Sequence, residues 1–242
     1  MARRRNNDYN PLEDWEPKTS LGRDVKNGNI THIDQILDHG KPILEPEITD
    51  TLLPDLQDEL ILVGQAKGKF GGGQRRIFKQ TQKKTREGNK PRFTTVAVVG
   101  NIDGYVGIGL GKSQETVPAR NKALRKAKLN VFKIRRGSGS WRSNTTEPHS
   151  IPFAVKGKSS SVKVELKPAP KGKGLCAEKE TQKIFELAGI QDIWFTSRGK
   201  TENKINLIQA VEKALKNLMK TKIRHKDTET LGIQEGHISL EQ

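Results

Sequence analysis

Residues 104–112 read Gly-Tyr-Val-Gly-Ile-Gly-Leu-Gly-Lys, an alternation that is typical of a β-strand with two unlike faces. One face would carry Val106, Ile108 and Leu110, and the other would carry only Gly107, Gly109 and Gly111. Glycine inside a strand loses much conformational freedom and gives no side chain to pack, so several together mark a close approach to the main chain. The sequence therefore predicts that another surface lies directly on this bare face.

The residues on either side of this strand predict an α+β unit. Residues 92–100 form an apolar, β-branched run of strand length, and residues 101–104 supply a turn between the two strands. After the glycine strand, Pro118 would open a helix whose apolar residues recur at helical spacing. These residues are Ala119, Ala123, Leu124, Ala127 and Val131. A short helix near residues 54–60 and a strand near 61–67 complete the order α-β-β-β-α.

A second unit follows the break at residues 137–141. Strands are predicted at 151–156, 161–166 and 193–196, and helices at 178–188, ended by Gly189, and at 203–219. We therefore expect an α+β protein with an acidic N-terminal extension (1–52), a first domain (53–136), a C-terminal α/β domain (137–221) and a loose polar tail (222–242). At this length and apolar content, two small cores suit the chain better than one large core.

The composition favours a polyanionic partner. Lysine and arginine number 44 against 28 acidic residues, which gives a formal net charge of +16 and favours nucleic acid as the partner. No apolar run of about 18 residues is present, so we expect no membrane association. The single cysteine, Cys176, cannot form an internal disulfide or supply a zinc site alone, and we expect it to be buried. These features are typical of a soluble cytoplasmic protein.

The charge is unevenly distributed along the chain. Residues 8–59 hold 13 acidic residues against four basic ones, together with five prolines. We interpret this segment as an extension that wraps over its own or a partner's surface, with a short helix at 31–37, and disorder is the alternative. Residues 67–92 hold ten basic residues against one acid, Glu87, and the polar stretch 79–90 predicts a protruding hairpin. Such a run would repel itself without a counter-charge, which favours a bound polyanion over a merely solvated face.

Catalytic motifs do not fit this sequence. The segment Gly111-Lys112-Ser113 looks like the end of a phosphate-binding loop, but Val106 occupies the position of that motif's first glycine. The five histidines are scattered, and His149 alone is of interest because it lies near Trp141. We therefore expect no enzymatic activity, no cofactor and no metal site.

Two blocks of sequence carry a family resemblance. Residues 98–115, followed by Pro118-Ala-Arg-Asn-Lys-Ala123, resemble the signature of the universal fifth-protein family of the small ribosomal subunit. Pro168-Ala-Pro-Lys-Gly-Lys-Gly-Leu175, residues 187–190 and the helix at 203–218 resemble the C-terminal domain of that family in the expected order. Residues 141–153, with Glu147-Pro-His-Ser-Ile-Pro-Phe153, and the extension with Trp15-Glu-Pro17 are similar to its archaeal branch.

The resemblance implies a fold, a role and partners. It implies a first domain like a double-stranded-RNA-binding domain and a second with a left-handed β-α-β crossover. It implies a structural role near the messenger entry channel of the small subunit, bound to rRNA and beside the fourth and eighth small-subunit proteins, without homo-oligomers. By position, residues 71–76 correspond to an RNA-penetrating loop, and residues 171–182 to a region that faces the fourth protein and is linked to decoding accuracy.

Charge and resemblance together predict the site residues. Those expected to bind rRNA are Lys69, Gly72, Gly73, Arg75, Arg76, Lys79, Lys83, Lys84, Arg92, Gly107, Gly109, Gly111, Lys112, Arg120, Lys122, Arg125, Lys126, Lys133, Arg135, Arg136, Trp141 and Arg142. Those expected to face a protein neighbour are Lys171, Lys173, Glu178, Lys179 and Gln182. Phe70, Phe78 and Trp141 are candidates for base stacking. For the bare glycine face we favour RNA as its cover, and the neighbouring helix is the alternative. A free-standing RNA-binding regulator or RNA chaperone would fit the charge equally well, but it would not account for the second motif block.

Overall fold

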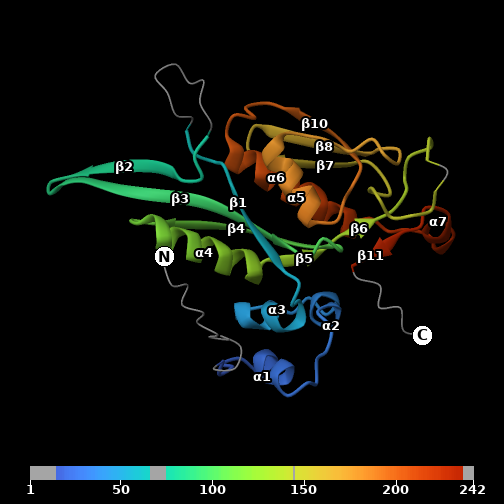
Figure 1. Ribbon diagram of the computed structural model, residues 1–242, viewed down its shortest axis with the longest axis horizontal. Helices are drawn as coiled ribbons and strands as arrows, with labels where there is room; N and C mark the ends of the chain where they lie inside the picture. Colours follow the sequence, from blue (N-terminus) through green and yellow to red (C-terminus); the bar gives the residue numbers. More distant parts are fainter. Residues whose placement is uncertain (1–14, 66–74, 144, 237–242) are drawn as a thin grey trace, which may run out of the picture.

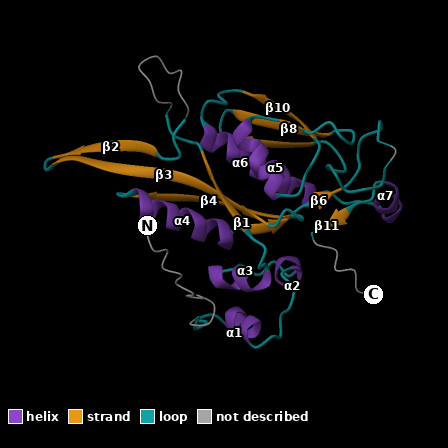
Figure 2. Ribbon diagram, viewed as in Figure 1, coloured by secondary structure: helices purple, strands orange, loops and turns teal. Residues whose placement is uncertain are grey.

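The computed structural model describes residues 15–65, 75–143 and 145–236 as a mixed α/β structure (Figure 1). Two sheets form its frame, and helices cover their faces (Figure 2). The first sheet is the central layer, because α4 and the N-terminal helices pack on one of its faces and the second sheet with its helices lies on the other.

The first sheet has the strand order β1-β3-β4-β5, and β2 pairs with the N-terminal half of β3. All of its neighbouring strands are antiparallel. The strands are β1 (Gln57–Ile61), β2 (Lys79–Thr85), β3 (Gly88–Gly100), β4 (Tyr105–Ser113) and β5 (Val131–Lys133). The predicted pair of strands around the turn at 101–104 is therefore confirmed.

The helix α4 (Thr116–Leu129) covers the glycine face of β4. A Cβ atom on Gly107, Gly109 or Gly111 would lie 2.1 to 2.2 Å from a backbone oxygen of α4. The helix meets these glycines through Ala119, Ala123 and Ala127, which are fully buried. The expectation that RNA meets the bare face is therefore wrong, and the alternative is correct: the glycines let a helix lie directly on the strand.

The predictions for the helix and the first strand that precede residue 67 are also wrong. The helix α3 spans Pro46–Leu52 rather than 54–60, because a residue that precedes proline disfavours helical backbone and Leu53 precedes Pro54. Residues 57–61 form β1 instead, and the strand ends at Ile61 rather than continuing to 67. The next amide, that of Leu62, donates to the carboxylate of Glu180 at 2.7 Å instead of extending the ladder.

The acidic extension folds onto the protein's own surface. It contains α1 (Ser20–Lys26), α2 (Asp34–Asp38) and α3, and its apolar side chains join one core with Ala97, Val99 and the inner face of α4. The buried carboxylate of Glu45 accepts hydrogen bonds from Trp15 Nε1 at 2.9 Å and from the amide of Thr19 at 2.7 Å. Disorder is therefore excluded for residues 15–65, and the predicted wrapping is confirmed as an intramolecular contact.

The second unit is a four-stranded sheet in the order β7-β8-β10-β9. Its strands are β7 (Val155–Ser159), β8 (Val162–Pro168), β9 (Leu175–Cys176) and β10 (Ile193–Arg198), and its helices are α5 (Lys179–Leu187) and α6 (Lys204–Lys220). The strand β9 runs parallel to β10, with α5 as the connection between them. Gly157 lies under α6 as the glycines of β4 lie under α4, since its Cβ would be 2.1 Å from the oxygen of Ala210. Cys176 is exposed, so the prediction that it is buried is wrong.

The described part of the tail is ordered against the body. After residue 222 the chain forms α7 (His225–Thr230) and β11 (Gln234–Glu235), which pairs with β6 (Arg135–Arg136). The amide of Ser138 also donates to the oxygen of Leu231 at 2.8 Å. The expectation of a loose tail is therefore wrong for residues 222–236, because main-chain hydrogen bonds fix the segment.

Two cores are present, as predicted, but they do not follow the two units. One core joins Val96, Val98, Val106 and Ile108 of the first sheet to the second sheet, α5 and α6. The other lies between the opposite face of the first sheet, α4 and the extension. The part of the first sheet formed by residues 94–100 of β3 and by most of β4 is therefore buried on both faces and holds the two units together.

Candidate nucleic-acid interface

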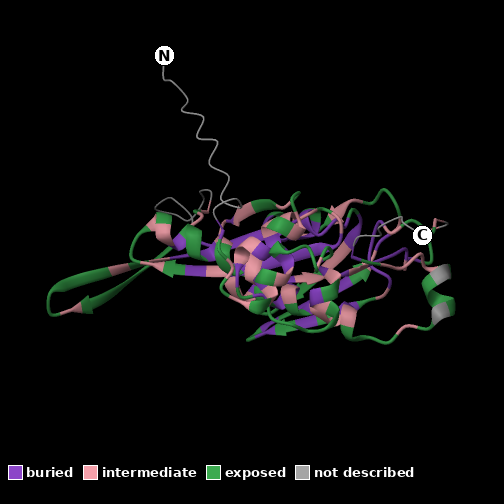
Figure 3. Cartoon of the chain, turned by 90° about the horizontal axis from the view of Figure 1, so that it is seen from below, coloured by how far each residue is buried: buried purple, intermediate pink, exposed green. Residues whose placement is uncertain are grey.

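The strand β2 and residues 88–94 of β3 form a ribbon that projects beyond the body (Figure 1), and almost all of it is solvent-exposed (Figure 3). The ribbon is closed by the turn at Arg86 and Glu87, where Thr85 Oγ1 donates to the oxygen of Gly88 at 2.7 Å. The predicted hairpin is therefore confirmed. A two-stranded ribbon with so little buried apolar surface is marginal without a partner.

The register of the ribbon places most of its positive charge on one face. Directly opposite residues share a face, and Lys83 lies opposite Lys90 while Thr81 lies opposite Arg92. Side chains two positions apart in a strand share a face, so Lys79, Thr81 and Lys83 of β2 all lie on this face. Lys90 lies 2.5 Å from the carboxylate of Glu87 in the turn, whereas Lys79, Lys83 and Arg92 have no ion pair among the described residues. Like charges in opposite positions destabilise a sheet, so this face favours a bound polyanion as further counter-charge.

A groove of about 700 Å³ lies between the base of the ribbon and the start of α6. Arg75, Arg76, Lys79 and Lys200 line it with positive charge, and Phe78 adds an aromatic ring. The guanidinium of Arg75 donates to the oxygen of Glu202 at 3.4 Å, which ties the two units together at this place. Lys200 was not predicted, and the sequence could not indicate it because it comes from the second unit.

A second groove, of about 580 Å³, lies at the N-terminus of α4. Arg92, Lys112 and Lys122 line it. The N-cap residue Glu115 also lines the groove, and it makes no side-chain hydrogen bond to the first turn of this helix. The three cationic side chains outnumber this one carboxylate, and together with the helix dipole they favour a bound phosphate.

The outer face of α4 continues this positive surface. Arg120, Lys122, Arg125 and Lys126 are exposed there, as predicted. Lys128 is different, because its Nζ atom lies 2.7 Å from the carboxylate of Asp50 in the extension.

Three predicted basic residues are used inside the protein. Lys133 is only 11% exposed in its side chain and pairs with Asp34 and Asp38. Arg135 bonds Glu235 and the main-chain oxygens of Leu218 and Thr221, and Arg136 bonds Asp103. Their assignment to RNA is wrong, because their charges are satisfied by partners far away in the sequence. The three glycines of β4 are removed from the interface for the reason given above. Lys69, Gly72, Gly73 and Phe70 lie outside the described residues.

Trp141 is 84% exposed on a loop that is fixed from below. Its ring lies 4.8 Å from the guanidinium carbon of Arg142, so the pair presents a flat cationic surface. Beneath the loop, the buried His149 bonds Asp192 through Nδ1 at 2.9 Å, and its Nε2 atom lies 3.3 Å from Ser143 Oγ. This network anchors the loop that carries the exposed Trp141 ring, and it gives His149 a structural role.

The residues predicted to face a protein neighbour divide into two groups. Lys171, Lys173 and Lys179 are exposed, although Lys171 lies 2.5 Å from the carboxylate of Glu147 and holds the pKa of that group below its usual range. Glu178 pairs with Lys204, and Gln182 donates to the oxygens of Leu175 and Ala177. These last two side chains therefore hold the local fold.

Other kinds of site find little support in the described ranges. No group of three or more acidic, histidine or cysteine side chains there could hold a metal ion. No described helix is long and apolar enough to cross a membrane.

Comparisons with known proteins agree on one family. Residues 77–135 match the model for the N-terminal domain of ribosomal protein S5, and residues 157–227 match the model for its C-terminal domain. The chain is 49% identical to small ribosomal subunit protein uS5 of Nanoarchaeum equitans over 227 residues, which are 94% of this chain and 97% of that protein. It is 44% identical to the uS5 protein of Methanocaldococcus jannaschii (94% and 98% covered) and 47% identical to that of Staphylothermus marinus (88% and 92%).

Proposed function

The chain belongs to the ribosomal protein S5 family, and from this we propose that it is a non-enzymatic structural constituent of the small subunit in cytoplasmic ribosomes. In this role it binds rRNA and other proteins of the subunit. The observation that carries the proposal is the cationic ribbon face together with the two basic grooves beside it.

The finer parts of the proposal concern fold and neighbours. The order α3, β1, β3, β4, α4 supports a first domain like a double-stranded-RNA-binding domain, with β2 as an added strand. We assign the left-handed β-α-β crossover to the parallel strands β9 and β10 and the helix α5 that connects them. We assign the fourth and eighth small-subunit proteins and the messenger entry channel as neighbours, with the exposed Lys171, Lys173 and Lys179 towards the fourth protein and an effect on decoding accuracy.

The mechanism is shape and phosphate recognition. The ribbon enters folded rRNA as an exposed cationic arm, and the grooves at its base hold backbone phosphates. Trp141 stacks on an unpaired base, assisted by Arg142. Glu87 pairs only with Lys90 in the ribbon. Because the RNA supplies the counter-charge for the other cations of this face, binding also fixes the ribbon's position.

Salt dependence of binding tests this mechanism. The triple variant with Lys79→Gln, Lys83→Gln and Lys90→Gln removes three cations from the ribbon. For its binding to an rRNA fragment, the slope of the logarithm of the association constant against the logarithm of the salt concentration should fall in magnitude by about 2 to 3, since each phosphate contact contributes about 0.7 to 0.9. The control Lys41→Gln, Lys213→Gln, Lys220→Gln changes the same charge at exposed positions elsewhere and should leave the slope unchanged. Equal slopes for the two variants would remove the ribbon from the interface.

Sedimentation separates this role from that of a free-standing RNA-binding regulator or RNA chaperone. A structural constituent should occur in small subunits at one copy per particle on a density gradient. A pool that sediments only slowly would reject the proposal.

A further inference from the structure

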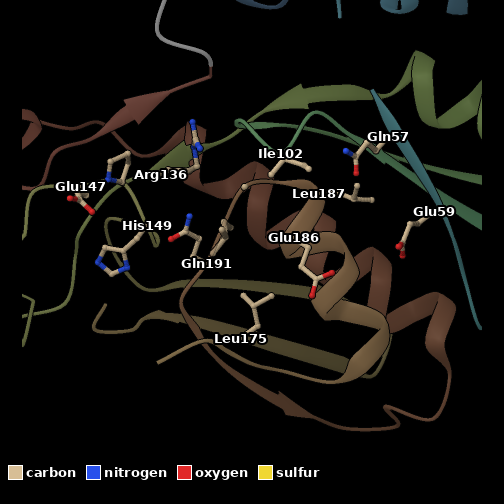
Figure 4. A pocket seen from close by; sticks show the side chains of 13 residues that line it. Gln57, Glu59, Ile102, Arg136, Glu147, His149, Leu175, Glu186, Leu187 and Gln191 are labelled. Atoms are coloured by element: carbon tan, nitrogen blue, oxygen red, sulfur yellow. The ribbon is translucent and has the colours of Figure 1, made fainter. Parts of the chain in front are cut away.

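A cleft that none of the rRNA contacts uses lies between β1 and the C-terminal end of α5. Its volume is about 690 Å³, and Figure 4 shows side chains from both elements around it. We call it the α5 cleft and define it by Gln57, Glu59, Ile102, Glu186, Leu187 and Ile190. Ile102 and Leu187 give its centre an apolar surface, with Glu59 on one side and Glu186 nearby (Figure 4).

The charge of the α5 cleft is opposite to that of the rest of the protein. Three glutamates line it, namely Glu59, Glu147 and Glu186, against one cation, Arg136, whose charge is taken by Asp103. Lys171 neutralises Glu147, and Lys183 lies 3.3 Å from Glu59. Glu186 has no ion pair among the described residues. In a chain of net charge +16, a negative apolar cleft repels phosphate and attracts cations.

Ile102 is held in a costly conformation at the centre of this cleft. Its φ angle is 61°, a region in which a β-branched residue is rare and strained by about 1 to 3 kcal/mol. Half of the side chain is nevertheless exposed. A glycine would adopt this backbone without strain, so the turn itself does not require an isoleucine.

The surroundings of Ile102 enforce this conformation. The amide of Ile102 donates to the oxygen of Leu187 at 3.0 Å, and Asn101 Oδ1 accepts from the amides of Asp103 and Tyr105. A Cβ on Gly189 would lie 2.1 Å from the oxygen of Ile102, so the turn is clamped on the end of α5. The cleft is therefore preformed, and a partner does not have to order it on binding.

We propose that the α5 cleft binds an extended segment of another protein that carries lysine or arginine beside an aliphatic residue. The aliphatic side chain packs on Ile102 and Leu187. One cation pairs with Glu186, which has no ion pair among the described residues, and a second competes with Lys183 for the carboxylate of Glu59. An extended segment would lie along β1, whose outer edge pairs with no strand in the described ranges. The inference goes beyond the rRNA contacts and does not depend on them.

Binding of labelled probes to the full chain tests the proposal. The probes are a fluorescein-labelled eight-residue peptide of alternating lysine and isoleucine, the same peptide with glutamate for lysine, and a fluorescein-labelled oligouridylate. Fluorescence anisotropy at low salt should show binding of the basic peptide and a much weaker signal with the acidic one. The double variant with Glu59→Gln and Glu186→Gln should bind the basic peptide with about fivefold lower affinity, because two exposed ion pairs are lost.

Ile102→Gly should lower the affinity for the same peptide by about tenfold, because apolar contact is lost. The midpoint of its thermal unfolding should be unchanged or higher, because the backbone strain is removed. The control Glu16→Gln, Glu47→Gln makes the same charge change outside the cleft and should leave the affinity unchanged. The proposal is overturned if the wild-type chain does not bind the basic peptide, or if the cleft variants bind it as the control does. It is also overturned if these variants lose oligouridylate instead, which would make the cleft an RNA site.

Discussion

At the scale of single residues, Gly109 shows how a pattern can be read correctly while its cause is read wrongly. The alternation of glycine and apolar residues predicted a strand with one bare face, and that strand is present. The pattern could not say which surface covers the glycines, because the answer depends on where α4 crosses the sheet. The carbonyl of Ala123 and the amide of Ala127 both lie 2.2 Å from the place of a Cβ on Gly109.

Gly109→Ala should therefore destabilise the isolated protein by about 3 kcal/mol or more, since backbone atoms of α4 would have to move. This differs from the expectation from sequence that RNA covers this face. Urea denaturation measures the effect, with Val117→Ala on the exposed side of α4 as a control that should change stability by less than about 0.5 kcal/mol. Equal midpoints for both variants would contradict the close packing.

Glu45 gives a second prediction at this scale. Burial raises the pKa of its carboxyl group, but hydrogen bonds from Thr19, Lys18 and Trp15 outweigh this and hold the pKa below the ordinary 4.5. A lowered pKa in the folded protein means that the stabilisation is complete above pH 4.5 and is lost as the pH falls through the folded value. Acid should therefore release the segment that Glu45 fixes.

The fluorescence of Trp15 reports this release when Trp141 and Trp194 are replaced by phenylalanine. Its emission should shift to the red at acid pH, as the ring leaves the core. Adding Glu45→Gln should make the shift largely independent of pH and lower stability at neutral pH by about 1 to 3 kcal/mol, because a buried acceptor is weakened. An unaltered acid transition in this variant would assign the effect to other carboxylates.

At the scale of elements, local signals identified most helices and strands, and contacts distant in sequence decided the errors. The ribbon was predictable because its strands are adjacent in the chain, but only the register shows that Lys79, Lys83, Lys90 and Arg92 share a face. The tail was misjudged because β11 is polar and short. It is ordered through pairing with β6, about 100 residues earlier, which no local pattern could indicate.

Removal of the tail tests this view of β11 and α7. A chain that ends at Thr221 should unfold at a lower temperature, since Arg135 loses Glu235 and Ser138 loses its main-chain partner at Leu231. Thermal unfolding followed by circular dichroism measures the change. Glu235→Gln in the full chain serves as the comparison, and it should have a smaller effect because the β6 and β11 main-chain pairing remains. If the truncated chain were as stable as the full one, the contacts of α7 and β11 would contribute nothing to the stability of the body.

At the scale of the whole molecule, the distribution of charge separates a surface for RNA from surfaces where RNA is excluded. Sequence correctly placed the acidic extension and the basic stretch, but it could not show that the extension neutralises lysines of α4 and β5. Asp34 and Asp38 pair with Lys133, and Asp50 pairs with Lys128. Within the first unit, the extension therefore leaves the ribbon, the grooves beside it and the outer face of α4 as the positive surface.

Asp34→Asn, Asp38→Asn, Asp50→Asn should release Lys128 and Lys133 and so increase affinity for RNA of unrelated sequence. If each freed lysine contacts one phosphate, the slope of log K against log salt for oligouridylate should rise by about 0.7 per contact, the value for single strands. The matched variant Glu16→Gln, Glu47→Gln, Asp24→Asn makes the same change of charge in the extension, at positions without an ion pair among the described residues. If both variants gained affinity equally, net charge alone would be responsible. If only the first gained affinity, the ion pairs of the extension would restrict RNA to the cationic surface.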